Sequence, residues 1–454
     1  MNELKRLFCL FAALSLLLIG CKTKTEYVSV GGEDSSVVSL PESSKVQQSS
    51  KPAPSSSSSS SKPKPPSFSS SQKPASSSKP VSSGSTVVIP SGEVGLHYFD
   101  NLNEAQKKIY LLIEDAVKNM TAGMIHLGVT TTKDVSLAFT AVRCDHPEYF
   151  WMPYSYINKI EGDDFSIALD YESDQSSVSY LCTKQQKKTM EAALKSKVAT
   201  IKKLIPSGAS DYEAELIVHD WICKNVNYVD TGDDEMRYTA YGALVNGKAI
   251  CEGYSRAMQL LCKELSIPCT LVCGVSTDRG ENHMWNVVKI GGEWYNLDVT
   301  WDDDDHNNLV THRFFNITDV VMNSTHKADP DFSTLSDSNF GGGTVPSYNF
   351  SLPACTAVSY HYAAQAGCTL DNNVDSSKAT LRTILKAAAD KKAPYCEFYL
   401  SYDVDSSVSA QDIAEKYTLQ NCKNVVNSNS KHKIVGMSIA LTGRTFIVIL
   451  NYGG

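Results

Sequence analysis

A pair of glycines, Gly291 and Gly292, separates two segments with strand character, and this pattern constrains the fold of the 454-residue chain more than any other. One segment runs over residues 285–290 and the other over 293–300. A glycine pair between two such segments is typical of the turn of an antiparallel hairpin. Counted from this turn, His283 and Asp298 lie at comparable distances. We therefore expect them to face each other across the hairpin ladder, where a carboxylate can orient an imidazole and fix its tautomer.

Cys251 lies at the predicted start of a helix. Residues 247–250 can turn, and apolar residues recur with helical spacing after Cys251. At a helix N-terminus, the dipole and the free backbone N–H groups favour a thiolate, and they can also stabilise an oxyanion on an attacked carbonyl. The sequence therefore predicts Cys251 as nucleophile, His283 as base and Asp298 as the orienting group.

These segments resemble the core of the transglutaminase-like superfamily, whose members carry Cys at a helix start and His and Asp on adjacent strands, in this chain order. The resemblance covers roughly residues 210–318 and rests on the cysteine helix and on the sequences HMWN at 283–286 and EWYNLDVTWD at 293–302. It implies a papain-like α+β core and attack on an amide through a thioester. It leaves the reaction open, because the superfamily includes cross-linkers, peptidases, amidases and inactive relatives.

Three further residues are candidates for substrate or oxyanion contacts, namely Tyr241, Trp285 and Asn286. Tyr241 could donate to the oxyanion or only line the cleft. Tryptophan side chains are more often packing residues than substrate platforms, and Asn286 could equally support the triad or lie at a solvated strand end. We keep all three as candidates.

The acidic run 302–305, followed by His306, offers the carboxylates that hard cations prefer. We interpret it as a solvated loop, because no alternating ligand pattern with a glycine turn follows. His219 and Asp220 belong to a helix predicted over residues 211–226, and we expect ordinary core or surface roles for them. Without zinc-type spacing, a phosphate loop or a dinucleotide fingerprint, the sequence predicts no metal site and no cofactor.

The first 21 residues have the features of a secretory signal. Lys5 and Arg6 precede an apolar run over residues 7–19, and Gly20 and Cys21 follow. This ending resembles the lipobox of bacterial lipoproteins, in which the cysteine receives a lipid and anchors the mature chain. A transmembrane anchor is the alternative, but the run is short of the roughly 20 residues that span a bilayer. We therefore expect lipidation of Cys21 and a location on the outer face of the membrane.

Composition divides the rest of the chain. Residues 22–93 are dominated by Ser, Pro and Lys and cannot bury enough apolar surface to fold, so we predict a flexible tether typical of a Gram-positive surface. An N-terminal α+β region is expected over 94–206, the catalytic domain over 207–330 and, beyond glycines 341–343, a small α/β unit over 345–454.

Periodicity predicts the elements within these regions. The helices are expected at 103–120, 185–205 and 211–226, with strands at 165–171 and 177–181 and a mixed segment that includes 135–142. The terminal unit has the order β-α-β-α-β-β, with strands at 356–362, 397–402, 434–440 and 445–451 and helices at 378–390 and 410–419. The even number of remaining cysteines leaves disulfides and free thiols equally open.

The net charge of −8 argues against a nucleic-acid partner, which would require a basic face. The function expected from these features is that of an extracellular, membrane-anchored thiol enzyme whose substrate is a protein or a cell-wall peptide. Hydrolysis is slightly favoured over transfer to an amine, since no amine tunnel is evident. The alternatives are a protein-glutamine transglutaminase and a non-catalytic adhesion or scaffold module.

Overall fold

The computed structural model describes residues 27–30, 37–38, 94–173, 176–232, 234–277, 280–304, 309–329, 350–405 and 407–453, apart from the side chains of residues 27–30, 37–38 and 442. The predicted signal peptide with Cys21, the glycines 341–343, and Asp305 and His306 of the acidic run lie outside these residues. Across the described part of the chain, none of the helices combines the length and apolar character that crossing a membrane requires. The mixture of helices and sheets confirms the predicted α+β class.

The N-terminal region combines helices with a small antiparallel sheet. The helices are α1 (His97–Asp100), α2 (Glu104–Asn119) and α3 (Thr132–Asp145), and α2 confirms the helix predicted at 103–120. Asn103 begins α2 with a reciprocal capping pair to Gln106, which satisfies N–H groups that a helix start leaves open. The sheet has the order β3-β5-β4, formed by β3 (Met124–Val129), β5 (Asp164–Ala168) and β4 (Ile157–Glu161). A short hairpin of β6 (Tyr171–Glu172) and β7 (Ser177–Val178) follows.

Three further helices lie between the N-terminal region and the central sheet in the chain. They are α4 (Lys184–Lys202), α5 (Asp211–Asn225) and α6 (Cys251–Glu264), and Thr183 and Ser210 cap the first two. One continuous apolar core contains residues of the N-terminal region and of the α5–α6 region, so it runs across the domain boundary expected near residue 206. The segment predicted as mixed, 135–142, lies in α3 and is buried in this core. The N-terminal region therefore supports α6 directly.

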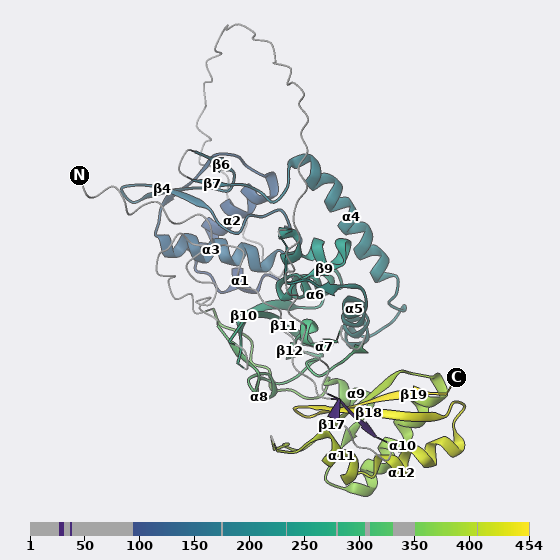
Figure 1. The fold of residues 1–454 in the computed structure, drawn as a ribbon. Coiled ribbons are helices and arrows are strands. Elements are labelled where there is room, and N and C mark those ends of the chain that lie inside the picture. Colours follow the sequence, from purple (N-terminus) through teal and green to yellow (C-terminus); the bar gives the residue numbers. More distant parts are fainter. Residues whose placement is uncertain are drawn as a thin grey trace, which may run out of the picture. The chain divides into compact units, whose positions relative to one another are not determined.

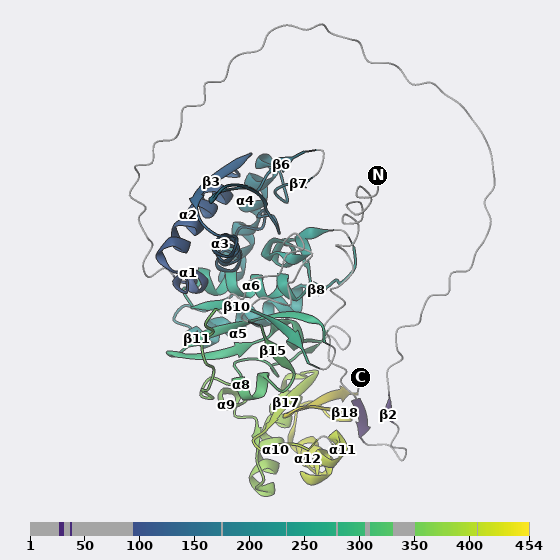
Figure 2. The same ribbon diagram turned by 90° about the vertical axis from the view of Figure 1, so that its left-hand side faces the viewer.

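The central sheet is antiparallel and has the order β12-β11-β10-β15 (Figures 1 and 2). Its strands are β10 (Cys269–Ser276), β11 (Asn282–Ile290), β12 (Glu293–Leu297) and β15 (His326–Ala328). Helix α6 packs on β10 and β11, where the Ser255 hydroxyl donates to the carbonyl of Met284. Short elements surround this core: β8 (Asn227–Tyr228), η1 (Glu235–Tyr238), η2 (Gly242–Asn246), β9 (Lys248–Ala249), α7 (Val299–Asp302), β13 (Asp303–Asp304), β14 (Leu309–Val310) and α8 (Asp319–Met322).

The C-terminal unit has its own apolar core and a sheet with the order β16-β17-β19-β18-β1-β2. Its strands are β16 (Thr369–Leu370), β17 (Tyr395–Leu400), β18 (Ile434–Thr442) and β19 (Thr445–Tyr452), and β1 (Tyr27–Val30) and β2 (Val37–Val38), from the stretch predicted as tether, add to the edge. The helices are α9 (Tyr362–Ala366), α10 (Val374–Lys391), α11 (Ala410–Lys416) and α12 (Leu419–Asn429), and α10, α11 and α12 lie on one side of the sheet (Figure 1).

One prediction for this unit was wrong, and one helix was not predicted. No strand forms over residues 356–362, where an irregular segment packs Ala357, Tyr360 and Tyr362 against the main core instead of pairing in a sheet. Tertiary burial there overrides a strand-like alternation. Helix α12 was not predicted, and its N-cap residue Thr418 provides no side-chain capping hydrogen bond that would mark its start.

Gly274 lets β15 and Trp285 approach β10 closely. A Cβ atom at residue 274 would lie 2.3 Å from the carbonyl oxygen of Lys327 and 2.6 Å from the Trp285 ring. We expect Gly274→Ala to lower the free energy of unfolding by about 1–3 kcal/mol, because the added methyl forces backbone and ring apart. Urea unfolding measures this change.

Gly436→Ala in β18 is the matched control, since its Cβ atom would meet only Asn451 at 3.5 Å, an ordinary contact. We expect Gly436→Ala to change stability by less than about 1 kcal/mol. Equal losses in the two variants would contradict the close packing at Gly274.

Candidate active site

Cys251 is the first residue of α6, as predicted. Ile250 precedes it as N-cap and provides no side-chain capping hydrogen bond, so the first turn keeps N–H groups for an incoming ligand. Two residues later Gly253 lets η1 pass close by, because a Cβ atom there would lie 2.4 Å from the carbonyl oxygen of Arg237. The helix start therefore offers both the positive end of a dipole and backbone donors beside the sulfur.

Asp298 lies just beyond the hairpin ladder. Strand β12 ends at Leu297, which pairs with Asn286, so His283 and Asp298 are not ladder partners as we had expected. Asp298 instead begins α7, and its Oδ1 accepts the N–H groups of Thr300 and Trp301. Its Oδ2 lies 2.7 Å from Nε2 of His283. The expected contact is thus present, although the carboxylate reaches it from a helix cap.

The electrostatics of the pair favour a charged imidazole. Burial lowers the pKa of His283, but the Asp298 carboxylate and the nearby sulfur of Cys251 outweigh it and raise the pKa to about 10. Burial likewise raises the pKa of Asp298, but His283 and His326 outweigh it and hold that pKa well below its usual range. Because Nε2 of His283 is engaged by Asp298, Nδ1 is the nitrogen left for the sulfur. An imidazolium beside the sulfur favours the thiolate.

A second histidine, His326 in β15, also contacts the carboxylate. Its Nε2 lies 3.1 Å from Oδ2 of Asp298, and its Nδ1 lies 2.8 Å from the Thr325 hydroxyl. Its ring packs against Trp301 with centroids 4.3 Å apart. Sequence reasoning missed His326, because a three-residue strand far along the chain gives no local signal. Its contact makes it a positioning residue for Asp298.

The three candidates for substrate or oxyanion contacts have other contacts in this structure. The indole N–H of Trp285 donates to Asn296, and the amide nitrogen of Asn286 donates to the carbonyls of Ser255 and Thr270. The ring of Tyr241 packs against Phe150, with centroids 5.0 Å apart. Trp285 also contacts the triad, because its ring stacks with that of His283 at a centroid distance of 6.1 Å. A role for these three residues at the substrate therefore stays a prediction, and the contacts here favour support of the fold.

A small pocket borders the start of α6. Glu252, the residue after Cys251, lines it together with Arg143 of α3 and Tyr154 of the segment that follows α3. Arg143 and Arg256 both pair with Glu252, at 3.1 and 2.9 Å. Two guanidinium groups against one carboxylate leave the pocket with an excess of positive charge.

No disulfide forms among the cysteines of the described residues, Cys251 included. Cys223 is instructive, since its sulfur also lies beside a histidine, 3.9 Å from Nε2 of His219. Burial is the main cause that raises the pKa of Cys223 to about 12. Proximity to an imidazole alone therefore does not activate a buried thiol.

Residues 199–299 match the family model described as transglutaminase-like superfamily. This part of the chain is a transglutaminase-like domain. It begins within α4 and ends one residue after Asp298, so it includes all three triad positions.

The curated relatives are peptidases that the chain matches over a limited stretch. Kyphoscoliosis peptidase of Mus musculus is 27% identical over 111 residues, and that of Homo sapiens is 26% identical over 111 residues. Each alignment covers 22% of this chain and 17% of the peptidase. Their activity is therefore a basis for a proposal only.

Two solved structures are also similar. A proposed cysteine protease from Cytophaga hutchinsonii is 24% identical with a TM-score of 0.21, and the match covers 27% of this chain and 40% of that one. A structure titled as a TGase is 14% identical with a TM-score of 0.23, covering 32% and 43%. Likeness at TM-scores this low carries no argument about the activity of this chain.

We expect iodoacetamide to alkylate Cys251 at mildly acidic pH at least about tenfold faster than Cys223. Cys251 has both the imidazolium of His283 and the start of helix α6 beside it, whereas Cys223 lies near the C-terminal end of α5. Both residues are largely buried, with 3% and 6% exposed, so access does not distinguish them. Peptide mapping by mass spectrometry measures the two rates in one sample. In His283→Gln the Cys251 rate should fall to that of Cys223. Equal rates in the unmodified sequence would contradict activation by His283.

Proposed function

We propose that this chain is an extracellular, lipid-anchored thiol hydrolase that cleaves an amide bond in a surface protein or a cell-wall peptide. Cys251 attacks the carbonyl carbon, and the N–H groups at the start of α6 stabilise the oxyanion. His283 then donates its proton to the leaving amine, which leaves a thioester on Cys251. A water molecule deprotonated by His283 attacks the thioester and releases the acid.

One observation carries the proposal. Nε2 of His283 lies 2.7 Å from the buried carboxylate of Asp298, and the sulfur of Cys251 is near enough to raise the pKa of the same imidazole. This chain of contacts supplies a nucleophile, a proton carrier and a group that orients it. A non-catalytic adhesion or scaffold module would not require a buried carboxylate and imidazole aligned behind a thiol.

The pocket beside α6 supports an acidic substrate. Its excess of guanidinium groups would attract carboxylates on a peptide substrate. The apolar run over residues 7–19, with Cys21 after it, supports the lipid anchor and the outer face of the membrane. A peptide that carries free carboxylates, as cell-wall peptides do, suits both features.

Amine transfer is a second candidate that the burial of the site favours. Cys251 is 3% exposed, and the side chains of His283 and Asp298 are fully buried. Transfer to an amine requires that water be kept from the thioester. A thioester on a buried sulfur is shielded from water. The two reactions share every step up to the thioester.

We expect the purified chain to cleave acidic peptides in a mixed peptide library, with activity reduced by at least about 10³-fold in Cys251→Ala. A labelled primary amine present in the same incubation reports transfer. Mass spectrometry of the peptides distinguishes a cleaved product from an amine adduct. Ser196→Ala changes an exposed residue of α4 and is the control for losses of activity during expression and purification.

Cleavage without amine incorporation supports the proposed hydrolase. Incorporation of the amine contradicts it and supports a transglutaminase instead. Turnover that persists in Cys251→Ala, or the absence of both products over the whole library, would contradict a thiol enzyme.

A further inference from the structure

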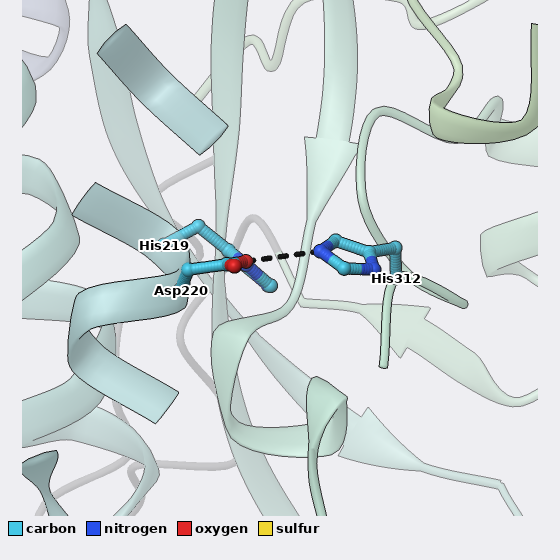
Figure 3. Close-up of side chains that lie close together, drawn as sticks. All are labelled: His219, Asp220 and His312. Atoms are coloured by element: carbon cyan, nitrogen blue, oxygen red, sulfur yellow. Dashed lines mark hydrogen bonds and ion pairs between the residues drawn. The ribbon is translucent and has the colours of Figure 1, made fainter. Parts of the chain in front are cut away.

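We propose that His219, Asp220 and His312 form a binding site for a zinc-type divalent cation, separate from the catalytic triad. Figure 3 shows the three side chains converging, with His219 and Asp220 from α5 and His312 from the segment after β14. One donor atom from each residue lies within 4.8 Å of the others. The donor set of two imidazoles and one carboxylate suits Zn²⁺ better than the all-oxygen cations.

The spacing of the donor atoms fits a small ion. Nδ1 of His219 lies 3.3 Å from Oδ1 of Asp220, and Nε2 of His312 lies 2.9 Å from the same oxygen. Tetrahedral zinc with bonds near 2.0–2.1 Å separates its ligand atoms by about 3.3 Å. Small side-chain rotations would therefore bring all three atoms to bonding distance.

Each histidine has a carboxylate behind it. Nε2 of His219 lies 3.3 Å from Asp302, and Nδ1 of His312 lies 2.7 Å from Glu397. Histidines that bind metals usually donate their second N–H to such a carboxylate, which fixes the tautomer and leaves the inner nitrogen with a lone pair. Here both outer nitrogens have that partner, so both inner nitrogens can face one ion.

The other His-Asp-His group among the described residues lacks this arrangement. His283 and His326 converge on Asp298, but their second nitrogens face the sulfur of Cys251 and the hydroxyl of Thr325. Its geometry serves proton transfer at a thiol. The contrast identifies the α5 group as the one arranged for a metal.

The surroundings hold the site rigid and leave an entry path. Tyr362 stacks on the His312 ring at 3.8 Å, and Lys224 binds Oδ2 of Asp220, at 2.8 Å, which leaves Oδ1 for the ion. The Asp220 side chain is 27% exposed, so an ion can reach the site from solvent. Because Glu397 belongs to β17, the bound ion would fasten the C-terminal unit to the catalytic domain.

The test uses the full chain, stripped with a chelator and titrated with Zn²⁺ by calorimetry and with Co²⁺ by absorption spectroscopy. We expect one ion per chain and a tetrahedral cobalt spectrum without a thiolate charge-transfer band. Asp220→Asn should abolish binding, and Glu397→Gln should weaken it about 10- to 100-fold. His326→Gln, in the triad group, should leave the affinity for Zn²⁺ unchanged.

The proposal is overturned if no ion binds, if the cobalt spectrum shows thiolate ligands, or if His326→Gln removes binding while Asp220→Asn keeps it. Circular dichroism in the presence of chelator checks the fold of each variant. If Asp220→Asn does not fold, Glu397→Gln decides. If His219, Asp220 and His312 form only an ion-pair cluster and zinc binds elsewhere, Glu397→Gln leaves the zinc affinity unchanged, and the proposal is overturned.

Discussion

The transglutaminase-like part of the molecule depends on one buried carboxylate, that of Asp298. Burying a charge without partners costs several kcal/mol, and Asp298 offsets this cost with two backbone N–H groups and two imidazoles. Those partners come from α7, β11 and β15, so the same contacts that stabilise the charge also fix three elements around it. The position of the imidazole beside Cys251 follows from this arrangement.

The carboxylate also explains why a histidine with no access to solvent is able to carry a proton. In an apolar pocket the imidazole would lose its charge, whereas beside Asp298 and the sulfur of Cys251 it keeps it. His326 shares the carboxylate and limits how it turns. The start of α6 favours the negative charge of a thiolate at Cys251. Charge at this site is therefore a property of the assembled fold rather than of any one residue.

Those parts of the site that rest on local sequence could be predicted. Helix caps, the glycine turn and the spacing from it to His283 and Asp298 act over a few residues, and they led to the right contact. The sequence did not predict that His283 and Asp298 are unpaired in the β11–β12 ladder, because Asp298 lies beyond the end of β12 and caps α7. His326 is 28 residues from Asp298, and His312 is 92 residues from Asp220. Contacts at that separation depend on tertiary packing, which explains why the sequence pointed to neither His326 nor a metal site.

The account makes one claim that can be observed directly, namely that His283 is an imidazolium beside Cys251 at neutral pH. Nitrogen-15 NMR of the histidine rings measures it, with the His283 signals assigned through His283→Gln. We predict that both ring nitrogens are protonated at neutral pH and that the signals titrate only near the raised pKa of about 10. Titration near the ordinary histidine value of 6.5 would contradict the account.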